Sequence, residues 1–156
     1  MTKKMIHLAL LLAILGVGLF GMVGNASADG VYHTERLSLE PVNAAPLRSG
    51  SVINIHADGP NIYAREIYML NGAAANTTYQ VVLNGYLGNT SCTGVADLII
   101  PTAMLTTNIS GNGLAYHVFT PADTAGLGGL TVGVQWQVWN GETLEYQTAC
   151  TIVMLD

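Results

Sequence analysis

The chain has 156 residues, of which half are hydrophobic and only 10% are charged. Ten Asp and Glu against five Lys and Arg give a net charge of −5. This balance argues against nucleic acid and anionic lipid as partners, because both are bound mainly through basic side chains. Neutral and cationic partners stay open.

The first 28 residues have the pattern of a secretory signal peptide. Two lysines precede an apolar run over 8–23, and Ala26-Ser27-Ala28 fits a cleavage site. The alternative is an uncleaved anchor, because an apolar run of this length is at the lower limit for crossing a bilayer. Cleavage removes 28 of 156 residues and leaves 128, one domain in size, with three arginines against ten acids and a net charge of −7. We expect a secreted protein without membrane contact after cleavage.

Beyond residue 28, apolar and polar residues alternate with period two, and helical periodicity does not recur. The segment 29–50 is expected to contribute at most one strand, over 31–39, and the main domain is expected to span 51–156. Turns rich in Gly, Asn and Pro separate its segments. Its expected strands cover 51–57, 65–70, 77–83, 95–100, 104–109, 114–119, 130–138 and 144–154.

Two of these strands carry further detail. The strand at 51–57 places Ile53 and Ile55 on one face and Asn54 and His56 on the other, which predicts a half-buried strand with its polar face in solvent. Pro101 cannot donate a hydrogen bond to a neighbouring strand, so it either ends the strand before it or places that strand at an edge.

Two hairpins are expected. Ser110-Gly111-Asn112-Gly113 predicts a hairpin that joins the strands on either side of it. In the last hairpin, a two-residue Asn140-Gly141 turn would set Trp136 opposite Glu145. A three-residue loop, Trp139-Asn140-Gly141, sets Trp136 opposite Leu144 instead, so we predict that loop together with a bulge.

Seven or eight short strands predict an all-β fold, an antiparallel β-sandwich. The segments 76–83 (NTTYQVVL) and 105–113 (LTTNISGNG) resemble strand and turn phrases of immunoglobulin-like and fibronectin-like domains in secreted prokaryotic proteins. The resemblance implies an immunoglobulin-like sandwich. It identifies no functional residue.

Cys92 and Cys150 are the two cysteines of the chain. An even cysteine count in an exported protein predicts one disulfide, and two buried free thiols are the alternative. No C-x-x-C or H-x-x-x-H spacing accompanies either cysteine, so we expect no metal site.

The common catalytic motifs are absent from the sequence, including G-x-S-x-G, H-E-x-x-H and the glycine-rich phosphate loop. We therefore expect no enzyme and no cofactor. An active site assembled from distant loops is the alternative, with His56, Asp58 and His117 as its candidates. A solvated polar strand face accounts for these residues more simply.

Three aromatic residues in or near loops are candidate contact residues: Trp139, Tyr86 and Tyr63. Exposed planar rings can stack on sugars or anchor proteins, so the expected partner is an extracellular protein or a glycan. The alternative is that these rings cap the ends of the core. Trp136, in the middle of an apolar strand face, is expected in the core.

Three N-x-S/T sequons, at Asn76, Asn89 and Asn108, are glycosylation acceptors if the host modifies exported proteins. The alternative is that these asparagines only shape turns.

The sequence predicts a secreted, disulfide-linked β-sandwich that acts as a binding or cell-surface interaction module. The structural alternative is a self-associating subunit of an extracellular assembly, because the mature chain lacks the lysines that often protect strand edges.

Overall fold

The computed structural model describes residues 33–56, 64–123 and 125–155. The expected signal peptide, Asp58 and Tyr63 lie outside the described residues. In the described part there are nine strands and no helix, which confirms the all-β prediction. The strands are β1 (His33–Pro41), β2 (Ser49–His56), β3 (Ala64–Asn71), β4 (Thr78–Leu87), β5 (Leu98–Thr106), β6 (Gly113–Phe119), β7 (Thr131–Asn140), β8 (Thr143–Thr148) and β9 (Thr151–Met154).

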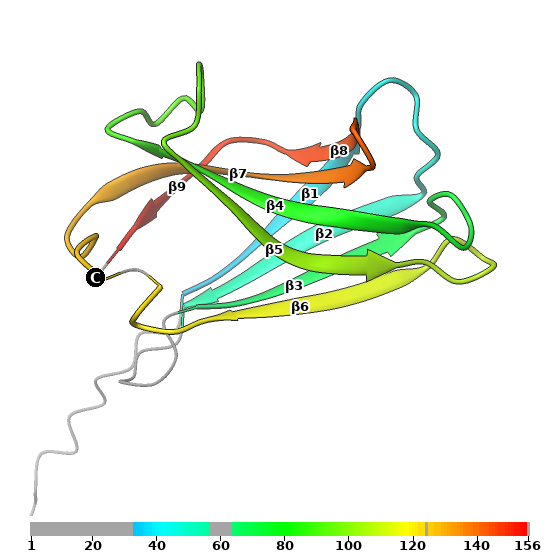
Figure 1. The fold of residues 1–156 in the computed structure, drawn as a ribbon, viewed down its shortest axis with the longest axis horizontal. Coiled ribbons are helices and arrows are strands. Elements are labelled where there is room, and N and C mark those ends of the chain that lie inside the picture. The colour runs from blue at the N-terminus through cyan, green and yellow to red at the C-terminus, as the bar shows by residue number, and fades with distance from the viewer. Residues whose placement is uncertain (1–32, 57–63, 124, 156) are drawn as a thin grey trace, which may run out of the picture.

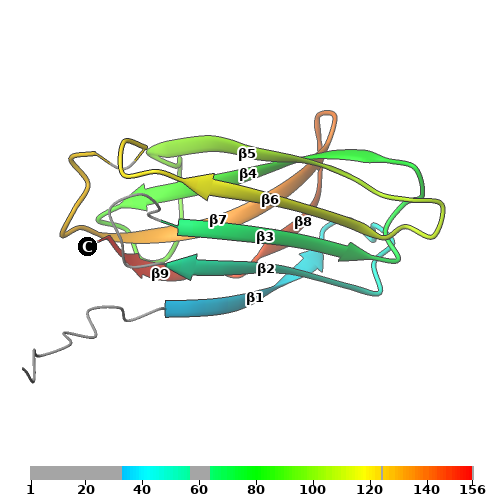
Figure 2. The same ribbon diagram turned by 90° about the horizontal axis from the view of Figure 1, so that it is seen from below.

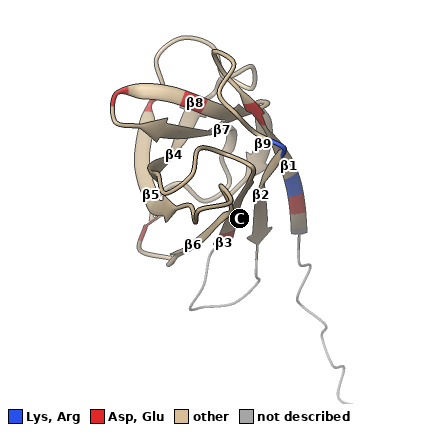
Figure 3. Cartoon of the chain, turned by 90° about the vertical axis from the view of Figure 1, so that its right-hand side faces the viewer, with Lys and Arg blue, Asp and Glu red and all other residues tan. Residues whose placement is uncertain are grey.

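The strands form one curled antiparallel sheet (Figures 1 and 2). Their order is β5-β4-β7-β8-β1-β2-β3-β6, and β9 pairs with β7. β1 joins the two halves, because residues 33–38 pair with β2 and residues 39–41 pair with β8. The outermost strands, β5 and β6, approach each other, so the sheet is nearly closed into a barrel around one interior (Figure 3).

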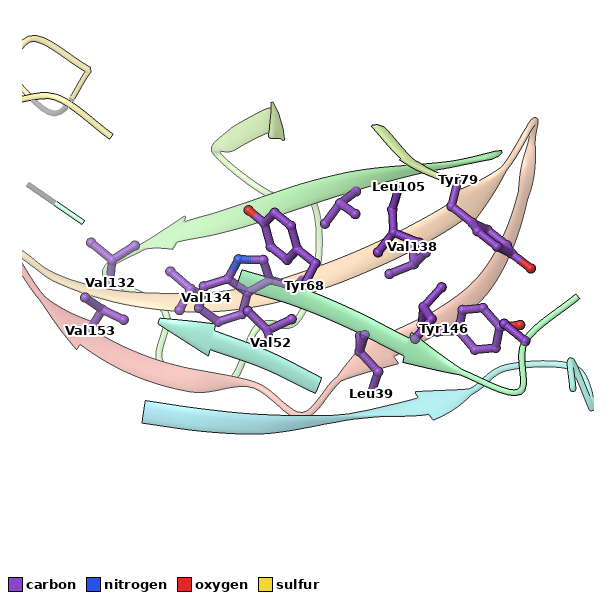
Figure 4. Packing of buried hydrophobic residues seen from close by; sticks show 14 residues of the cluster. Leu39, Val52, Tyr68, Tyr79, Leu105, Val132, Val134, Val138, Tyr146 and Val153 are labelled. Carbon is purple, nitrogen blue, oxygen red and sulfur yellow. The ribbon is translucent and has the colours of Figure 1, made fainter. Parts of the chain in front are cut away.

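The interior is filled mainly by β4, β7 and β8 on one side and by β2 and β3 on the other (Figure 4). Trp136 is fully buried, as predicted, and lies on β7 with three inward valines. The strand expected over 77–83 is confirmed as part of β4, and its Tyr79 and Val81 are fully buried. The largest buried apolar side chains are Trp136, Tyr68, Tyr79, Tyr146, Leu105, Val52, Val81, Val132 and Val138.

The prediction of a solvent-facing polar side of β2 is wrong. Val52 and Asn54 point inward, with Asn54 only 3% exposed, and Ile53 and Ile55 point outward. Register fixes this orientation, because Val52 lies opposite Tyr68 of β3 and both fill the core. Once Val52 faces inward, alternation brings Asn54 to the same side.

β5 runs without interruption past Pro101, so the two strands predicted on either side of it are one. The register between β4 and β5 shifts at Val81 and Val82, and Thr102 is the extra residue. Its Oγ1 donates to Val81 O at 3.3 Å. β5 ends the strand order, and an edge strand or a bulge is where a proline without an N–H is tolerated.

The predicted hairpin at 110–113 is also wrong, because β5 and β6 share no ladder and lie at opposite ends of the strand order. Asn108 organises the connection between them. Its Oδ1 accepts hydrogen bonds from Ser110 N at 2.9 Å and from Asn112 N at 3.0 Å. The Asn and Gly residues of this segment form a tight corner between the two halves of the sheet.

The last hairpin differs from both registers considered above. Asn140 lies opposite Thr143, so Gly141-Glu142 is the turn, and Gly141 has the positive φ of 58° that a type II′ turn needs at this position. The bulge lies at Glu145 on β8. It sets Val138 opposite Tyr146, and both side chains are buried.

The strand predicted over 144–154 is interrupted after Thr148 and continues as the separate strand β9. The alternation of buried and exposed side chains therefore starts anew in β9, which exposes Ile152 and Met154.

Candidate functional site

The outer surface of β4, β7 and β8 carries a row of amide side chains beside Trp139. Gln80 lies opposite Trp139, and Gln147 lies opposite Gln137. Paired residues of antiparallel strands point to the same face, and neighbours such as Val138 are buried, so the row faces outward. We call this surface the amide face, made of Gln80, Gln135, Gln137, Trp139 and Gln147.

The amide face combines a planar ring with amide donors and acceptors. Gln135 Nε2 donates to Thr148 O at 3.1 Å, and Gln137 Nε2 lies 3.4 Å from Gln135 Oε1. Trp139 is half-buried and lies opposite Leu144. Stacking on an indole ring and hydrogen bonding to amides are the two contacts that sugar rings accept.

The loop between β4 and β5 covers one end of the amide face. Cys92 in this loop is bonded to Cys150, which confirms the predicted disulfide. The loop packs closely on Gly133 of β7, where a Cβ atom would lie 2.3 Å from Asn89 O. Tyr86, in register with Gly133, is only 6% exposed. The structure thus places Tyr86 beneath the loop with little of its side chain exposed, and its role as a contact residue stays a prediction.

The three sequons differ in accessibility. Asn76 and Asn108 are exposed. Asn89 is partly buried, and its Nδ2, the atom that would carry a glycan, donates to Thr93 O at 2.7 Å. Glycosylation stays a prediction, and Asn76 and Asn108 are its more accessible positions.

A buried carboxyl group lies in the interior on β3. Glu66 is 1% exposed and has Asn54 and His117 as register partners, so all three side chains lie on the inner face. Tyr68 Oη donates a hydrogen bond to Glu66 Oε2. Burial raises the pKa of Glu66 to about 7, an effect opposed by the hydrogen bond from Tyr68 and by the Trp136 side chain. Glu66 therefore exchanges its proton near neutral pH.

Glu66 borders a cavity of about 100 Å³ at the end of the barrel where β2 and β6 end. Two buried polar atoms of its lining residues, Asn54 Oδ1 and Trp136 Nε1, have no hydrogen-bond partner of good geometry. Sequence analysis missed this site. The available signal was the alternation of Glu66 with Tyr68 and Leu70, which marks a carboxylate on a core-facing strand side.

The active site expected from His56, Asp58 and His117 stays a prediction, because the described residues include only the two histidines. His56 borders the cavity, and its Nε2 lies 2.9 Å from Asn54 Nδ2. The His117 ring packs edge-on against Phe119, with 4.5 Å between ring centroids. Asp58 is not among the described residues. Within 33–56, 64–123 and 125–155, no group of three or more His, Cys, Asp or Glu could hold a metal ion.

A second surface, on the outside of β2, β3 and β6, is unusually apolar. Leu114 is 66% exposed and Tyr116 is 74% exposed. Arg36 and Arg65 are exposed on the same side, because they lie in register with Ile53 and Ile55. We call it the apolar outer face, made of Ile53, Ile55, Ile67, Met69, Leu114 and Tyr116.

Comparison with protein-family models, with curated proteins and with solved structures finds no match for this chain. In the part of the chain that the structure describes, no helix is long and apolar enough to cross a membrane. The Cys92–Cys150 disulfide is compatible with an extracellular location.

Proposed function

We propose that this protein is a secreted binding module that recognises neutral glycan chains through the amide face. The observation that carries the proposal is the row of four glutamines next to Trp139 on one outer sheet surface. Their side chains are uncharged, which suits the hydroxyl groups of a neutral sugar. Sheet strands hold these residues in fixed register, so a ligand does not have to order them on binding.

The remaining surface agrees with a neutral ligand. Charged residues are few and scattered over the fold (Figure 3). The mature chain would carry −7, so an acidic polysaccharide would be repelled. The signal-peptide pattern and the disulfide support a location in which such glycans occur.

We also propose that the two halves of the sheet are the layers of an immunoglobulin-like sandwich. If β2 to β8 correspond to strands A to G, the neighbours β2-β3-β6 and β4-β7-β8 match the A-B-E and C-F-G pairings of constant-type domains. β5 differs, because it pairs with β4 in place of β6. An experimental structure in which β5 keeps its hydrogen bonds to β4 and also bonds to β6, so that the barrel is closed, would contradict this assignment.

Replacing Trp139 with Ala is expected to weaken glycan binding about tenfold or more, because the stacking surface is lost. Replacing Gln137 with Ala should have a smaller effect, about fivefold, through a lost hydrogen bond. Affinity electrophoresis in neutral polysaccharides such as xylan, mannan and starch measures both. Tyr116→Ala, an exposed ring on the opposite surface, is the matched control. A wild type that binds none of these glycans, or a Trp139→Ala variant that binds equally well, would refute the proposal.

The apolar outer face favours a second candidate function, self-association into an extracellular assembly. An exposed apolar surface of this kind is typical of protein interfaces. β6 forms one side of this face, and its sequence GLAYHVF has neither a charged residue nor a proline. A second copy could pack its own apolar outer face on this one around a two-fold axis and cover Leu114 and Tyr116.

The double variant Leu114→Ser, Tyr116→Ser is expected to be more monomeric than the wild type, because it removes the most exposed apolar side chains of this face. Light scattering coupled to size-exclusion chromatography at increasing protein concentration measures the average mass. Trp139→Ala should behave as the wild type. If the wild type is already monomeric at the highest concentration, self-association is excluded.

A further inference from the structure

The cavity beside Glu66 has the composition of a ligand site. Apolar side chains from several strands form most of its wall, including Leu83, Leu98, Ile100 and Val134. Polar groups gather at one end, where Glu66 and Asn54 lie in register on neighbouring strands. A largely apolar pocket with a few convergent polar groups is the usual form of a small-molecule site.

Unused hydrogen-bonding capacity marks the polar end. Asn54 Oδ1 is a buried acceptor without a partner, and the Trp136 indole, whose Nε1 makes no hydrogen bond of good geometry, acts on the Glu66 carboxyl. Leaving such groups unpaired in the interior is costly, and a bound molecule with polar atoms would compensate. Both residues are less than a tenth exposed and border the cavity.

The charge of the lining selects the kind of ligand. Glu66 and Asp123 are acidic, and no Lys or Arg is among the described residues that border the cavity. A ligand with a carboxylate would find no cation there. A ligand with an ammonium group would find the Glu66 carboxylate and the Asn54 carbonyl oxygen as acceptors.

We propose that this cavity binds a small primary alkylammonium ion, with its ammonium group on Glu66 and Asn54 and its alkyl chain along Leu98 and Val134. The cavity volume of about 100 Å³ sets the size. A dry apolar cavity of about 150 Å³ holds benzene, so an alkyl chain of about four carbons fits here. This ligand is separate from the glycan of the amide face, and each site can fail its test independently.

Binding of n-butylammonium to the full mature chain tests the proposal by NMR titration at pH 8. The expected result is saturable shifts of the Trp136 indole and Asn54 side-chain signals, with about fourfold weaker affinity for propylammonium, which has one methylene fewer. Butanol should bind at least about tenfold more weakly, and butyrate not at all, because both lack the cation. Glu66→Gln should lose at least about tenfold in affinity, whereas Glu40→Gln, an exposed glutamate of β1 that does not border the cavity, is the matched control and should retain it.

The pH dependence of the wild type provides a second measurement that needs no variant. Affinity should fall about tenfold per pH unit below pH 7, as Glu66 takes up its proton. The other titratable groups that face this end are His56 on β2, Tyr68 on β3, His117 on β6 and Asp123 in the loop after β6. If millimolar butylammonium produces no shifts, or shifts of equal midpoint in wild type and Glu66→Gln, the proposal is wrong.

Discussion

Removing the Cys92–Cys150 disulfide is expected to lower the free energy of unfolding by about 4 kcal/mol. The two cysteines are 58 residues apart, and a loop of this length loses much chain entropy when it is closed in the unfolded state. A small domain has about 5–15 kcal/mol of stability in total, so the bridge supplies a large share of it. The variant is Cys92→Ala with Cys150→Ala, and urea unfolding monitored by tryptophan fluorescence measures the loss.

The position of the bridge predicts where the structure loosens first. Cys92 holds the loop over Gly133 and Tyr86, and Cys150 anchors it to the segment between β8 and β9. Without the bond, amide hydrogen exchange should accelerate in residues 88–97 before it does in β7. Reductant added to the wild type should reproduce the lower stability and leave the alanine variant unchanged. A loss below about 1 kcal/mol would show that loop packing alone holds this end of the sheet.

Sequence patterns predicted those parts of the fold in which one local rule is sufficient. Val132, Val134, Trp136 and Val138 alternate without interruption, and β7 buries all four. The disulfide followed from cysteine count and expected compartment, since no other pairing was available. Both predictions concern features that do not depend on which strands become neighbours.

The inner face of β2 could not be assigned from its own sequence. Ile53 and Ile55 predict that one face of the strand is buried, whereas Val52 predicts that the opposite face is buried. The neighbouring strand decides, because Tyr68 needs the space beside Val52 and brings Glu66 to the same side as Asn54. The candidate site at Glu66 was therefore missed together with the strand orientation. Trp139 was expected in the hairpin loop but lies within β7, and its role as a contact residue stays a prediction.

Long-range pairing was the other source of error. Asn and Gly between 108 and 113 have the composition of a hairpin turn, and the structure uses it for a corner. β6 pairs with β3 and not with β5. The paired strands β4 and β5 lie between β3 and β6 in the sequence. Local turn chemistry cannot distinguish these outcomes, because both need tight backbone bends and side-chain caps.

Replacing Glu66 with Gln is expected to stabilise the protein above pH 7, although it changes a fully buried side chain. Burial raises the pKa of Glu66 from 4.5 to about 7, so the folded protein resists its ionisation. Below pH 4.5 the carboxyl is protonated in both folded and unfolded chains. Between pH 4.5 and 7 only the unfolded chain releases the proton, so the stability of the wild type falls as pH rises through this window.

The loss amounts to about 3 kcal/mol above pH 7, since one pKa unit corresponds to about 1.4 kcal/mol. Gln keeps the acceptor for Tyr68 Oη and cannot ionise, so its curve should lack this slope. Urea unfolding of both proteins at pH 4, 6 and 8 measures the difference, with Glu40→Gln, an exposed glutamate of β1, as the control. Equal stability of wild type and Glu66→Gln at pH 8 would show that the carboxylate is stabilised internally.

With Glu66 in this position, the protein is expected to be less stable at neutral pH than the Glu66→Gln variant. Such a cost is typical of sites retained for function, because selection for stability alone would favour the neutral side chain. The same substitution should therefore raise stability and weaken alkylammonium binding at least about tenfold. If Glu66→Gln gains stability and also binds butylammonium as the wild type does, the proposed role of Glu66 in ammonium binding would be wrong. Only the conclusion that the buried carboxylate lowers stability would hold.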